Sequence, residues 1–392
     1  MVQALHSNQL STTDLDGGTL DKLQAVLGDD PVLTALMQRI VGLFRPVLLL
    51  DGSDRAYSDV DITLDGPFTV ETWVRLEPGI NNEDGILGSS GSLDMNFYDS
   101  KFRVWVGGGI NDAIVARRPI VPNVWTHIAV TRDEDGKFRI YQDGQLDSDI
   151  SKSAPQKFEK LRIGWTGAKG GTAGALDEFR IWGRARNADE IVKTFDRGFD
   201  DAARPSELLF VANGTHPWGK PSGGARVAKT MDFPPLLTAA EAASLDAKFA
   251  RLRGLAEMPG NVERGRSLAA MCRACHLIQG TGSNIGPNLS SAGAMGTEAL
   301  LRNILTPNAA MEPGYRIYRV TMKTGEIHEG FLVSDYKDAV VLRVPGTEDR
   351  RINRREIAQE TFLRRSLMPE GLLDAMQPQD VSDLFAYLMT LR

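Results

Sequence analysis

Hydrophobic positions along this chain follow two different spacings. From residue 47 to 185 they alternate in short runs such as FTVETWVRL, which are rich in β-branched and aromatic residues and separated by turn formers. Short alternating runs with frequent turns predict a β-sandwich. From residue 259 to 392 apolar positions recur at intervals of three and four, which predicts helices, and alternation returns only over about 315–355. The pattern therefore predicts a multidomain α+β protein, in which a jelly-roll-like sandwich precedes a helical domain with a small β insertion.

Two further segments flank the predicted sandwich. Apolar positions between residues 19 and 43 have helical spacing, so we expect 1–46 to be an N-terminal helical segment. Residues 186–258 combine helical stretches with the Pro/Gly-rich stretch NGTHPWGKPSGG. Because proline and glycine clusters are typical of loops, we expect 186–258 to connect the two domains through helices and loops.

The composition excludes several classes of protein. The net charge is −6, and the acidic excess lies in the first two thirds of the chain, which argues against nucleic acid as a partner. The most apolar stretch, residues 31–50, is interrupted by Arg39, Arg45 and Pro46, so we expect no transmembrane segment. With two cysteines, the chain is not a disulfide scaffold.

Both cysteines stand in one motif with a histidine, Cys272-Arg-Ala-Cys275-His276. A structural zinc site needs about four ligands, and the chain has no second cysteine pair. A thioredoxin-like redox pair stands at the start of a helix, whereas here the helical spacing leads into the motif from before it. Covalent haem uses all three residues, because two thioethers fix the porphyrin and the adjacent histidine ligates the iron. The motif therefore favours one haem c over a structural pair of reduced cysteines.

A haem that carries electrons usually has a sixth ligand, and methionine is the common partner of histidine. Met368 stands in the stretch SLMPEGL, where proline and glycine keep the chain out of a helix and can direct a thioether inward. A single methionine more often fills a core, so the choice depends on position. Met368 is the first candidate, and the weaker ones are Met311, Met295 and Met376.

The flanks of the motif add two expectations. The loop 286–289, Gly-Pro-Asn-Leu, follows the motif at the distance where a loop passes the histidine side of a haem. The carbonyl of Pro287 can accept a hydrogen bond from the His276 ring and set its tautomer, although an ordinary turn explains the same residues. We also expect the last helix, 378–391, to pack against the helix over 261–275.

These residues together resemble class I cytochromes c. The order of the CRACH motif, the GPNL loop, the β insertion and the SLMPEGL loop is similar to the haem-binding domain frequent in Planctomycetes and Verrucomicrobia, over roughly 255–392. The resemblance implies that Cys272 and Cys275 attach the haem. It also implies that His276 and Met368 are the axial ligands of the iron.

Residues 47–185 resemble the laminin-G/concanavalin-A-like sandwich, through FTVETWVR, NVWTHIAVTRDEDGKFRIYQDGQL and GALDEFRIWGR. Members of that broad class bind glycans, bind proteins or brace a neighbouring domain. Some hold calcium, and Asp84, Asp177 and Glu178 are conceivable ligands here, although acidic turn residues are usually only solvated.

Aromatic and acidic residues of the sandwich raise a carbohydrate-related alternative. Trp105, Trp125 and Trp182 could stack on sugars, but their place in alternating runs favours core packing for most of them. A glycosidase needs two carboxylates that face one cleft. Glu71 and Glu178 are isolated candidates for such a pair.

The cytochrome resemblance implies electron transfer. With His276 and Met368 both on the iron, no position is open to a substrate, so we expect an electron carrier rather than an enzyme. Its partner would be a redox protein, a dehydrogenase or a terminal acceptor, and the sandwich would dock to a polysaccharide or a protein. In the alternative, the sandwich carries the main function in carbohydrate binding or processing, and the haem domain is an electron relay. A haem sensor or peroxidase in which Met368 dissociates is the least favoured interpretation.

Bacterial haem attachment takes place outside the cytoplasm, so the haem interpretation implies a periplasmic or envelope protein. The chain begins without a secretory leader, and we therefore expect a mature or trimmed form. A basic cluster near Met368 is either a solvated surface or a contact for haem propionates or an acidic partner. This cluster comprises Arg350, Arg351, Arg354, Arg355, Arg364 and Arg365.

Overall fold

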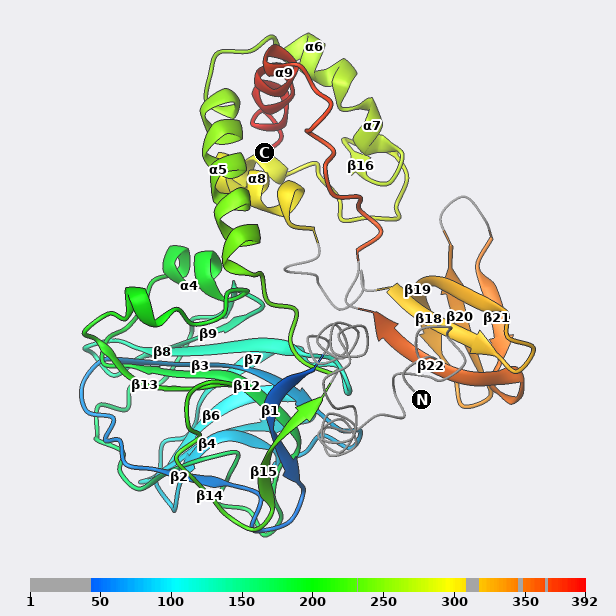
Figure 1. Ribbon diagram of the computed structural model, residues 1–392. Helices are drawn as coiled ribbons and strands as arrows, with labels where there is room; N and C mark the ends of the chain where they lie inside the picture. The colour runs from blue at the N-terminus through cyan, green and yellow to red at the C-terminus, as the bar shows by residue number, and fades with distance from the viewer. Residues whose placement is uncertain (1–43, 231, 308–316, 345–347, 364–365) are drawn as a thin grey trace, which may run out of the picture. The chain divides into compact units, whose positions relative to one another are not determined.

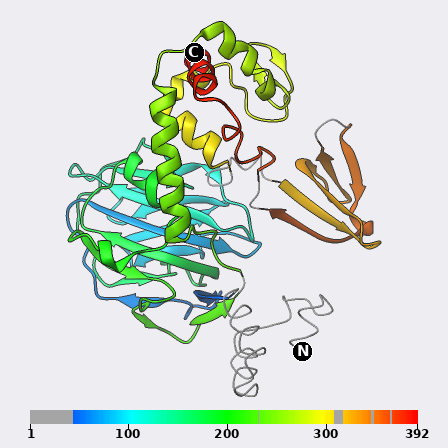
Figure 2. The same cartoon turned by 45° about the horizontal axis from the view of Figure 1, so that its top comes forward.

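The computed structural model describes residues 44–230, 232–307, 317–344, 348–363 and 366–392. The chain divides into two compact units, the first ending at Leu236 and the second beginning at Leu237. Figures 1 and 2 show strands dominating the first unit, and helices with a separate small sheet in the second. Up to residue 43, the helical segment expected over 1–46 lies outside the described residues. Its last two residues belong to a strand, β1 (Arg45–Asp51), and not to a helix.

The first unit is a sandwich of two antiparallel sheets. The larger sheet has the strand order β10-β9-β8-β3-β12-β1-β15, with β13 also on β12, and the smaller has the order β14-β2-β11-β4-β5-β6-β7. The larger sheet comprises β1 (Arg45–Asp51), β3 (Phe68–Leu76), β8 (Thr126–Arg132), β9 (Phe138–Gln142), β10 (Gln145–Ser148), β12 (Ala173–Trp182), β13 (Leu208–Ala212) and β15 (Ala225–Thr230). The smaller sheet comprises β2 (Ser58–Val60), β4 (Gly85–Ser89), β5 (Leu93–Tyr98), β6 (Lys101–Val106), β7 (Asn111–Pro119), β11 (Leu161–Ile163) and β14 (Lys220–Pro221). The predicted sandwich is confirmed.

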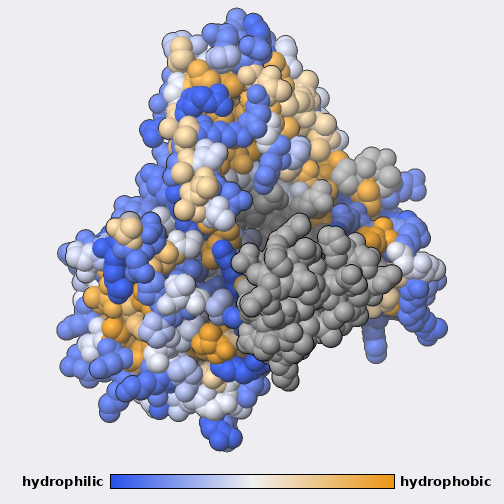
Figure 3. Space-filling model, viewed as in Figure 1, coloured by the Kyte–Doolittle hydropathy of each residue, from blue (hydrophilic) through white to orange (hydrophobic). Residues whose placement is uncertain are grey.

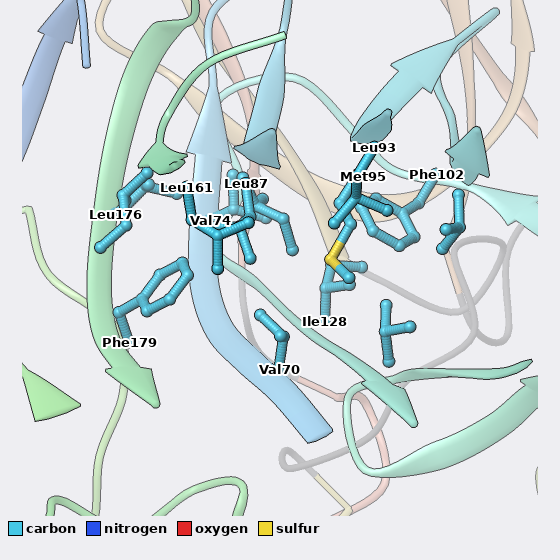
Figure 4. Packing of buried hydrophobic residues seen from close by; sticks show 14 of the residues in the cluster. Val70, Val74, Leu87, Leu93, Met95, Phe102, Ile128, Leu161, Leu176 and Phe179 are labelled. Atoms are coloured by element: carbon cyan, nitrogen blue, oxygen red, sulfur yellow. The ribbon is translucent and has the colours of Figure 1, made fainter. Parts of the chain in front are cut away.

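One hydrophobic core lies between the two sheets, with Val74 and Phe179 from the larger sheet and Met95 and Phe102 from the smaller one (Figure 4). Strand β6 shows why the sequence alternates, because Phe102 and Val104 are fully buried while the residue between them is only half-buried. Burying such a side chain contributes ~1.5–3 kcal/mol. A shift of one residue would turn this whole set outward, so the alternation determines the register.

The sandwich continues beyond its expected end at residue 185. Strand β13 pairs with β12, β14 with β2 and β15 with β1, so residues 208–230 belong to both sheets. This differs from the connector expected over 186–258. The short strands around the Pro/Gly-rich stretch are stabilised by the edges on which they pair, and their own pattern is too weak to reveal them.

The second unit has a helical part with its own core. Its helices are α5 (Ala239–Ala256), α6 (Val262–Leu268), α7 (Ala270–Arg273), α8 (Thr297–Leu305) and α9 (Pro378–Leu388). Leu252, Leu301, Leu384, Phe385 and Leu388 are among the residues buried there. Among the described helices of the chain, none is long and apolar enough to cross a membrane.

Helix α6 packs tightly against α9 at Gly265. A Cβ atom on Gly265 would lie 1.9 Å from the carbonyl oxygen of Asp383 and 2.8 Å from Cβ of Tyr387. The Asp383 side chain reaches back, and its Oδ1 accepts a hydrogen bond from the backbone N–H of Asn261 (2.7 Å) at the start of α6. The packing expected between the 261–275 segment and the last helix is therefore present.

A five-stranded antiparallel sheet interrupts the helical part, with the order β21-β20-β19-β18-β22. Its strands are β18 (Ile317–Met322), β19 (Ile327–Asp335), β20 (Ala339–Arg343), β21 (Arg350–Asn353) and β22 (Ile357–Leu363). A separate small core lies in this sheet and contains Tyr318, Val320, Val340, Leu342 and Ile352. The insertion expected over about 315–355 therefore extends eight residues further along the chain, to Leu363.

Candidate functional site

The CRACH motif lies at the end of helix α7, which stops at Arg273. Backbone hydrogen bonds from Cys275 N (3.1 Å) and His276 N (2.8 Å) to the Cys272 carbonyl continue the helical turn through the motif. Both cysteines are free and half-buried, and Cys272 packs against the helical core. Burial raises the pKa of Cys272, so this group is a neutral thiol at neutral pH. A neutral thiol does not suit a thioredoxin-like nucleophile.

The following loop holds the histidine ring from one side. The backbone N–H of Gly286 donates to the Cys275 carbonyl (2.7 Å), and that of Leu289 donates to the Leu277 carbonyl (2.9 Å). His276 Nδ1 lies 2.7 Å from the carbonyl oxygen of Pro287. Because a carbonyl can only accept, this contact places the proton on Nδ1 and leaves the lone pair of the other ring nitrogen free to bind a metal.

Gly286 lies against the same ring. A Cβ atom at this position would lie 2.5 Å from Cε1 and 2.8 Å from Nδ1 of His276. Only glycine leaves room for the ring next to the loop backbone. Two free, half-buried cysteines and a tautomer-fixed imidazole in one turn of chain fit the donor set of a covalently bound haem.

The methionines differ in how the structure places them. Met368 lies half-buried in an irregular stretch, where its backbone N–H donates to Ser366 Oγ (3.1 Å). Met376 packs against the helical core, and Met295 is 48% exposed at the end of a short 3-10 helix. Met311 lies outside the described residues. The structure brings together the two cysteines, the histidine and the proline of the predicted site, and Met368 as axial ligand stays a prediction.

Apolar side chains are exposed on the helical unit near the motif. Met271, one residue before Cys272, is 44% exposed. Figure 3 shows apolar residues among the hydrophilic ones on the visible face of this unit.

The conceivable calcium ligands already have partners. Oδ2 of Asp84 accepts from Asn81 N (3.0 Å), and Oδ1 accepts from Ala173 N (3.1 Å). Burial and the charge of Glu178 raise the pKa of Asp177 to about 7. Within the described residues, no group of three or more His, Cys, Asp or Glu side chains could hold a metal ion. Calcium binding therefore gains no support from the geometry.

Glu71 is buried at the centre of an ionic cluster on the larger sheet. Its carboxylate accepts hydrogen bonds from Arg186 Nη1 (2.7 and 2.9 Å) and from Trp182 Nε1 (2.9 Å). Arg180 Nη1 lies 3.8 Å from Oε1, and His127 Nε2 lies 3.7 Å from Oε2. Burial opposes ionisation of Glu71, but the guanidinium charges outweigh it and lower the pKa of this carboxyl.

Glu178 is a second carboxylate that pairs with Arg180. Arg180 Nη2 donates to its Oε2 (2.5 Å), and Asn213 Nδ2 donates to its Oε1 (3.1 Å). A glycosidase acid needs substrate contact and a raised pKa. Glu71 and Glu178 are buried and ion-paired, so the two carboxylates considered for hydrolysis do not form a catalytic pair. The arginines that hold them were not singled out from the sequence. Arg180 is a charged residue within the buried strand β12, which is a signal for an ion pair, whereas Arg186 lies after that strand and carries no such signal.

The three tryptophans fall into two groups. Trp125 and Trp182 are buried, and the indole N–H of Trp125 donates to Asp232 Oδ1 (2.8 Å). Core packing, expected for most of them, is confirmed for these two. Trp105 is half-buried and lies on the side of β6 that faces away from the core.

The basic cluster lies largely in ion pairs of the small sheet. Arg351 pairs with Asp338 (3.0 Å), and Arg354 pairs with both Asp335 and Glu360. Part of the basic cluster therefore forms ion pairs that stabilise the small sheet. Arg364 and Arg365 lie outside the described residues.

Residues 51–192 match the family model of the concanavalin A-like lectin/glucanases superfamily. The first unit therefore contains a concanavalin A-like domain. The match ends before the second unit, so it says nothing about the function of that unit. No curated protein sequence matches this chain.

Solved structures similar to this chain include a supposed carbohydrate binding protein from Bacteroides ovatus, at 19% identity and a TM-score of 0.39. That match covers 50% of this chain and 62% of the Bacteroides protein, less than two thirds of its length. A heptameric pentraxin from Limulus polyphemus is 15% identical over 47% of this chain and 95% of its own, with a TM-score of 0.35. Domain 4 of an extracellular arabinanase from Geobacillus stearothermophilus, in complex with arabinotriose, is 17% identical over 37% and 74%, with a TM-score of 0.29.

Proposed function

We propose that this protein binds carbohydrate through its sandwich and that its second unit holds one covalent haem as an electron relay. The observation that carries the carbohydrate part is the match of residues 51–192 to a superfamily of lectins and glucanases. Binding is favoured over hydrolysis, because Glu71 and Glu178 are buried in ion pairs.

Affinity electrophoresis of the full chain tests carbohydrate binding. In native gels that contain a soluble polysaccharide, a binding protein migrates more slowly than in plain gels. We expect retardation by at least one polysaccharide in a panel of neutral and acidic polymers. Unchanged mobility across the whole panel would contradict this part of the proposal.

The haem part rests on the hydrogen bond between His276 Nδ1 and the Pro287 carbonyl (2.7 Å). Cys272 and Cys275 would attach the group, and His276 with Met368 would ligate its iron. When bound, the group supplies reversible one-electron Fe(III)/Fe(II) chemistry. The Pro287 carbonyl holds the proton on Nδ1 and leaves Nε2 unprotonated, so Nε2 would be the atom that ligates the iron, while Gly286 leaves space for the ring.

A visible spectrum of periplasmically matured protein tests the haem part. We expect a low-spin haem spectrum, with pigment that stays on the chain in acidified butanone. Met368→Ala should remove the methionine–iron charge-transfer band, and Met376→Ala serves as the matched control. Colourless protein, or pigment that extracts into the solvent, would exclude covalent haem.

A second candidate function is electron transfer as the main activity, with the sandwich as a docking module. The geometry of His276, Gly286 and Pro287 supports it, because a proton held on Nδ1 leaves Nε2 available to a metal. The partner would be a dehydrogenase or a terminal acceptor, and covalent attachment implies a periplasmic or envelope location. Reduction by such a dehydrogenase at rates independent of polysaccharide would favour this function over the relay.

A further inference from the structure

The outer surface of the smaller sheet carries a row of polar and aromatic side chains. Leu93, Met95 and Phe102 point into the core (Figure 4), so the alternate residues of β5 and β6 point away from it. Asp94 in β5 pairs directly with Trp105 in β6. Directly paired residues of antiparallel strands share one face, with Cβ atoms ~4.5–5.5 Å apart. A carboxylate and an indole therefore lie side by side on this outer face.

A second tryptophan lies over the adjoining strand. Gly88 in β4 pairs with Asp94 in β5, and a Cβ atom on Gly88 would lie 2.6 Å from the Trp165 carbonyl oxygen and 3.1 Å from its ring. The glycine thus makes room for Trp165 above the sheet. Arg162, the partner of Gly88 on β11, holds that indole, because its guanidinium carbon lies 5.0 Å from the ring centroid. Both tryptophans are half-buried, so part of each remains exposed.

The charged side chains on this face differ in whether they have an ion-pair partner. Arg162 pairs with Asp59 (3.0 Å), and Arg103 pairs with Asp112 (2.8 Å). Asp94 Oδ1 accepts from the backbone N–H of Gly167 (2.9 Å). Among the described residues, no cationic nitrogen lies within 4.0 Å of the Asp94 carboxylate, although the charge of Arg103 acts on it from further away. The carboxylate can therefore accept hydrogen bonds from hydroxyl donors.

Based on the carbohydrate binding proposed above, we propose that a neutral oligosaccharide binds across β4, β5 and β6, with one ring on Trp105 and its hydroxyls on Asp94. The apolar C–H face of a pyranose suits an indole, and two neighbouring hydroxyls suit a carboxylate. Strands β4 and β6 are two spacings apart, about 10 Å. This distance lets Trp165 contact a neighbouring sugar ring.

Affinity electrophoresis of the full chain tests the site with named probes. These probes are hydroxyethyl cellulose, galactomannan and arabinan as neutral polymers, and polygalacturonate as an acidic one. We expect Trp105→Ala and Asp94→Asn each to weaken binding of a neutral polymer by at least tenfold. Trp105→Phe keeps an aromatic face and should retain most of the affinity. Ile150→Ala is the control, because Ile150 is 83% exposed outside the row and its loss should change nothing.

The outcomes separate this inference from the function on which it rests. If the wild type binds no polymer, carbohydrate binding itself fails, and the site fails with it. If the wild type binds but both Trp105→Ala and Asp94→Asn bind equally well, only this site is overturned. Binding to polygalacturonate alone overturns the neutral ligand. Should Trp105→Ala unfold, as seen by circular dichroism, Asp94→Asn decides, because that change preserves shape and leaves the core untouched.

Discussion

Two glycine-to-alanine changes in the second unit should have effects of opposite sign. At Gly265 the new methyl group would lie 2.6 Å from the Asp383 carbonyl carbon, whereas carbon atoms pack at about 3.5–4.0 Å. Helices α6 and α9 must therefore separate by about 1 Å. Overpacking of this kind costs about 1–3 kcal/mol, and sometimes more. Because the obstacle is backbone, we expect a loss of about 3 kcal/mol, at the upper end of that range.

Gly254 provides the matched control. It is exposed in helix α5, and nothing lies within 4 Å of a Cβ atom there. Alanine should stabilise this helix by about 0.5–1 kcal/mol, because glycine loses more conformational freedom on folding.

Urea unfolding can follow the two units separately. All six tryptophans belong to the first unit, so their fluorescence reports on the sandwich. Circular dichroism at 222 nm follows the helices, most of which, in the described part of the chain, lie in the second unit. With a slope of about 2 kcal/mol per molar urea, Gly265→Ala should lower the dichroism midpoint by about 1.5 M. The fluorescence midpoint should stay in place. A dichroism midpoint that shifts by less than about 0.3 M, equivalent to about 0.6 kcal/mol at this slope, would refute the close crossing of α6 and α9.

The remaining predictions concern titration, the buried cluster and the histidine loop. His127, whose pKa burial lowers to about 4, stays neutral in the fold, so sandwich stability should fall by up to about 3 kcal/mol from pH 6.5 to 4. Asp177, with a pKa raised to about 7, acts oppositely, since the unfolded chain loses its proton from about pH 4 upward. In tryptophan-monitored urea midpoints, His127→Gln should therefore gain stability relative to wild type at low pH, and Asp177→Asn should gain it at neutral pH. Gains for both variants at the same end of the pH range would contradict this pair of assignments. Glu71→Gln should lower the free energy of unfolding of the sandwich by about 3–5 kcal/mol, because it leaves buried arginine charge unpaired. A loss smaller than about 1 kcal/mol would show that Glu71 does not hold these buried charges. Gly286→Ala should displace the His276 ring and lower the dichroism midpoint by the equivalent of about 1–3 kcal/mol, and an unchanged midpoint would show that the loop yields freely.

The local sequence pattern was sufficient to predict most strands of the sandwich. The run FTVETWVRL became strand β3, and the Asp143-Gly144 turn joins β9 to β10 with φ values of +49° and +78°. Such a two-residue turn needs positive φ at both positions, which Asp-Gly tolerates. The sequence also predicted a haem motif from the spacing of two cysteines and a histidine, and that assignment stays a prediction.

Only the tertiary structure decided how distant residues meet. Strands β13 to β15 are stabilised by the edges on which they pair, and Glu71 is ion-paired because Arg186, far along the chain, reaches its carboxylate. The pairing of Asp94 with Trp105 on one outer face likewise depends on the register between β5 and β6. The alternation of either strand alone does not specify that register. Period and turn chemistry act over a few residues, so the sequence determined the elements, whereas pairing, burial and charge partners depend on contacts between segments far apart in the chain.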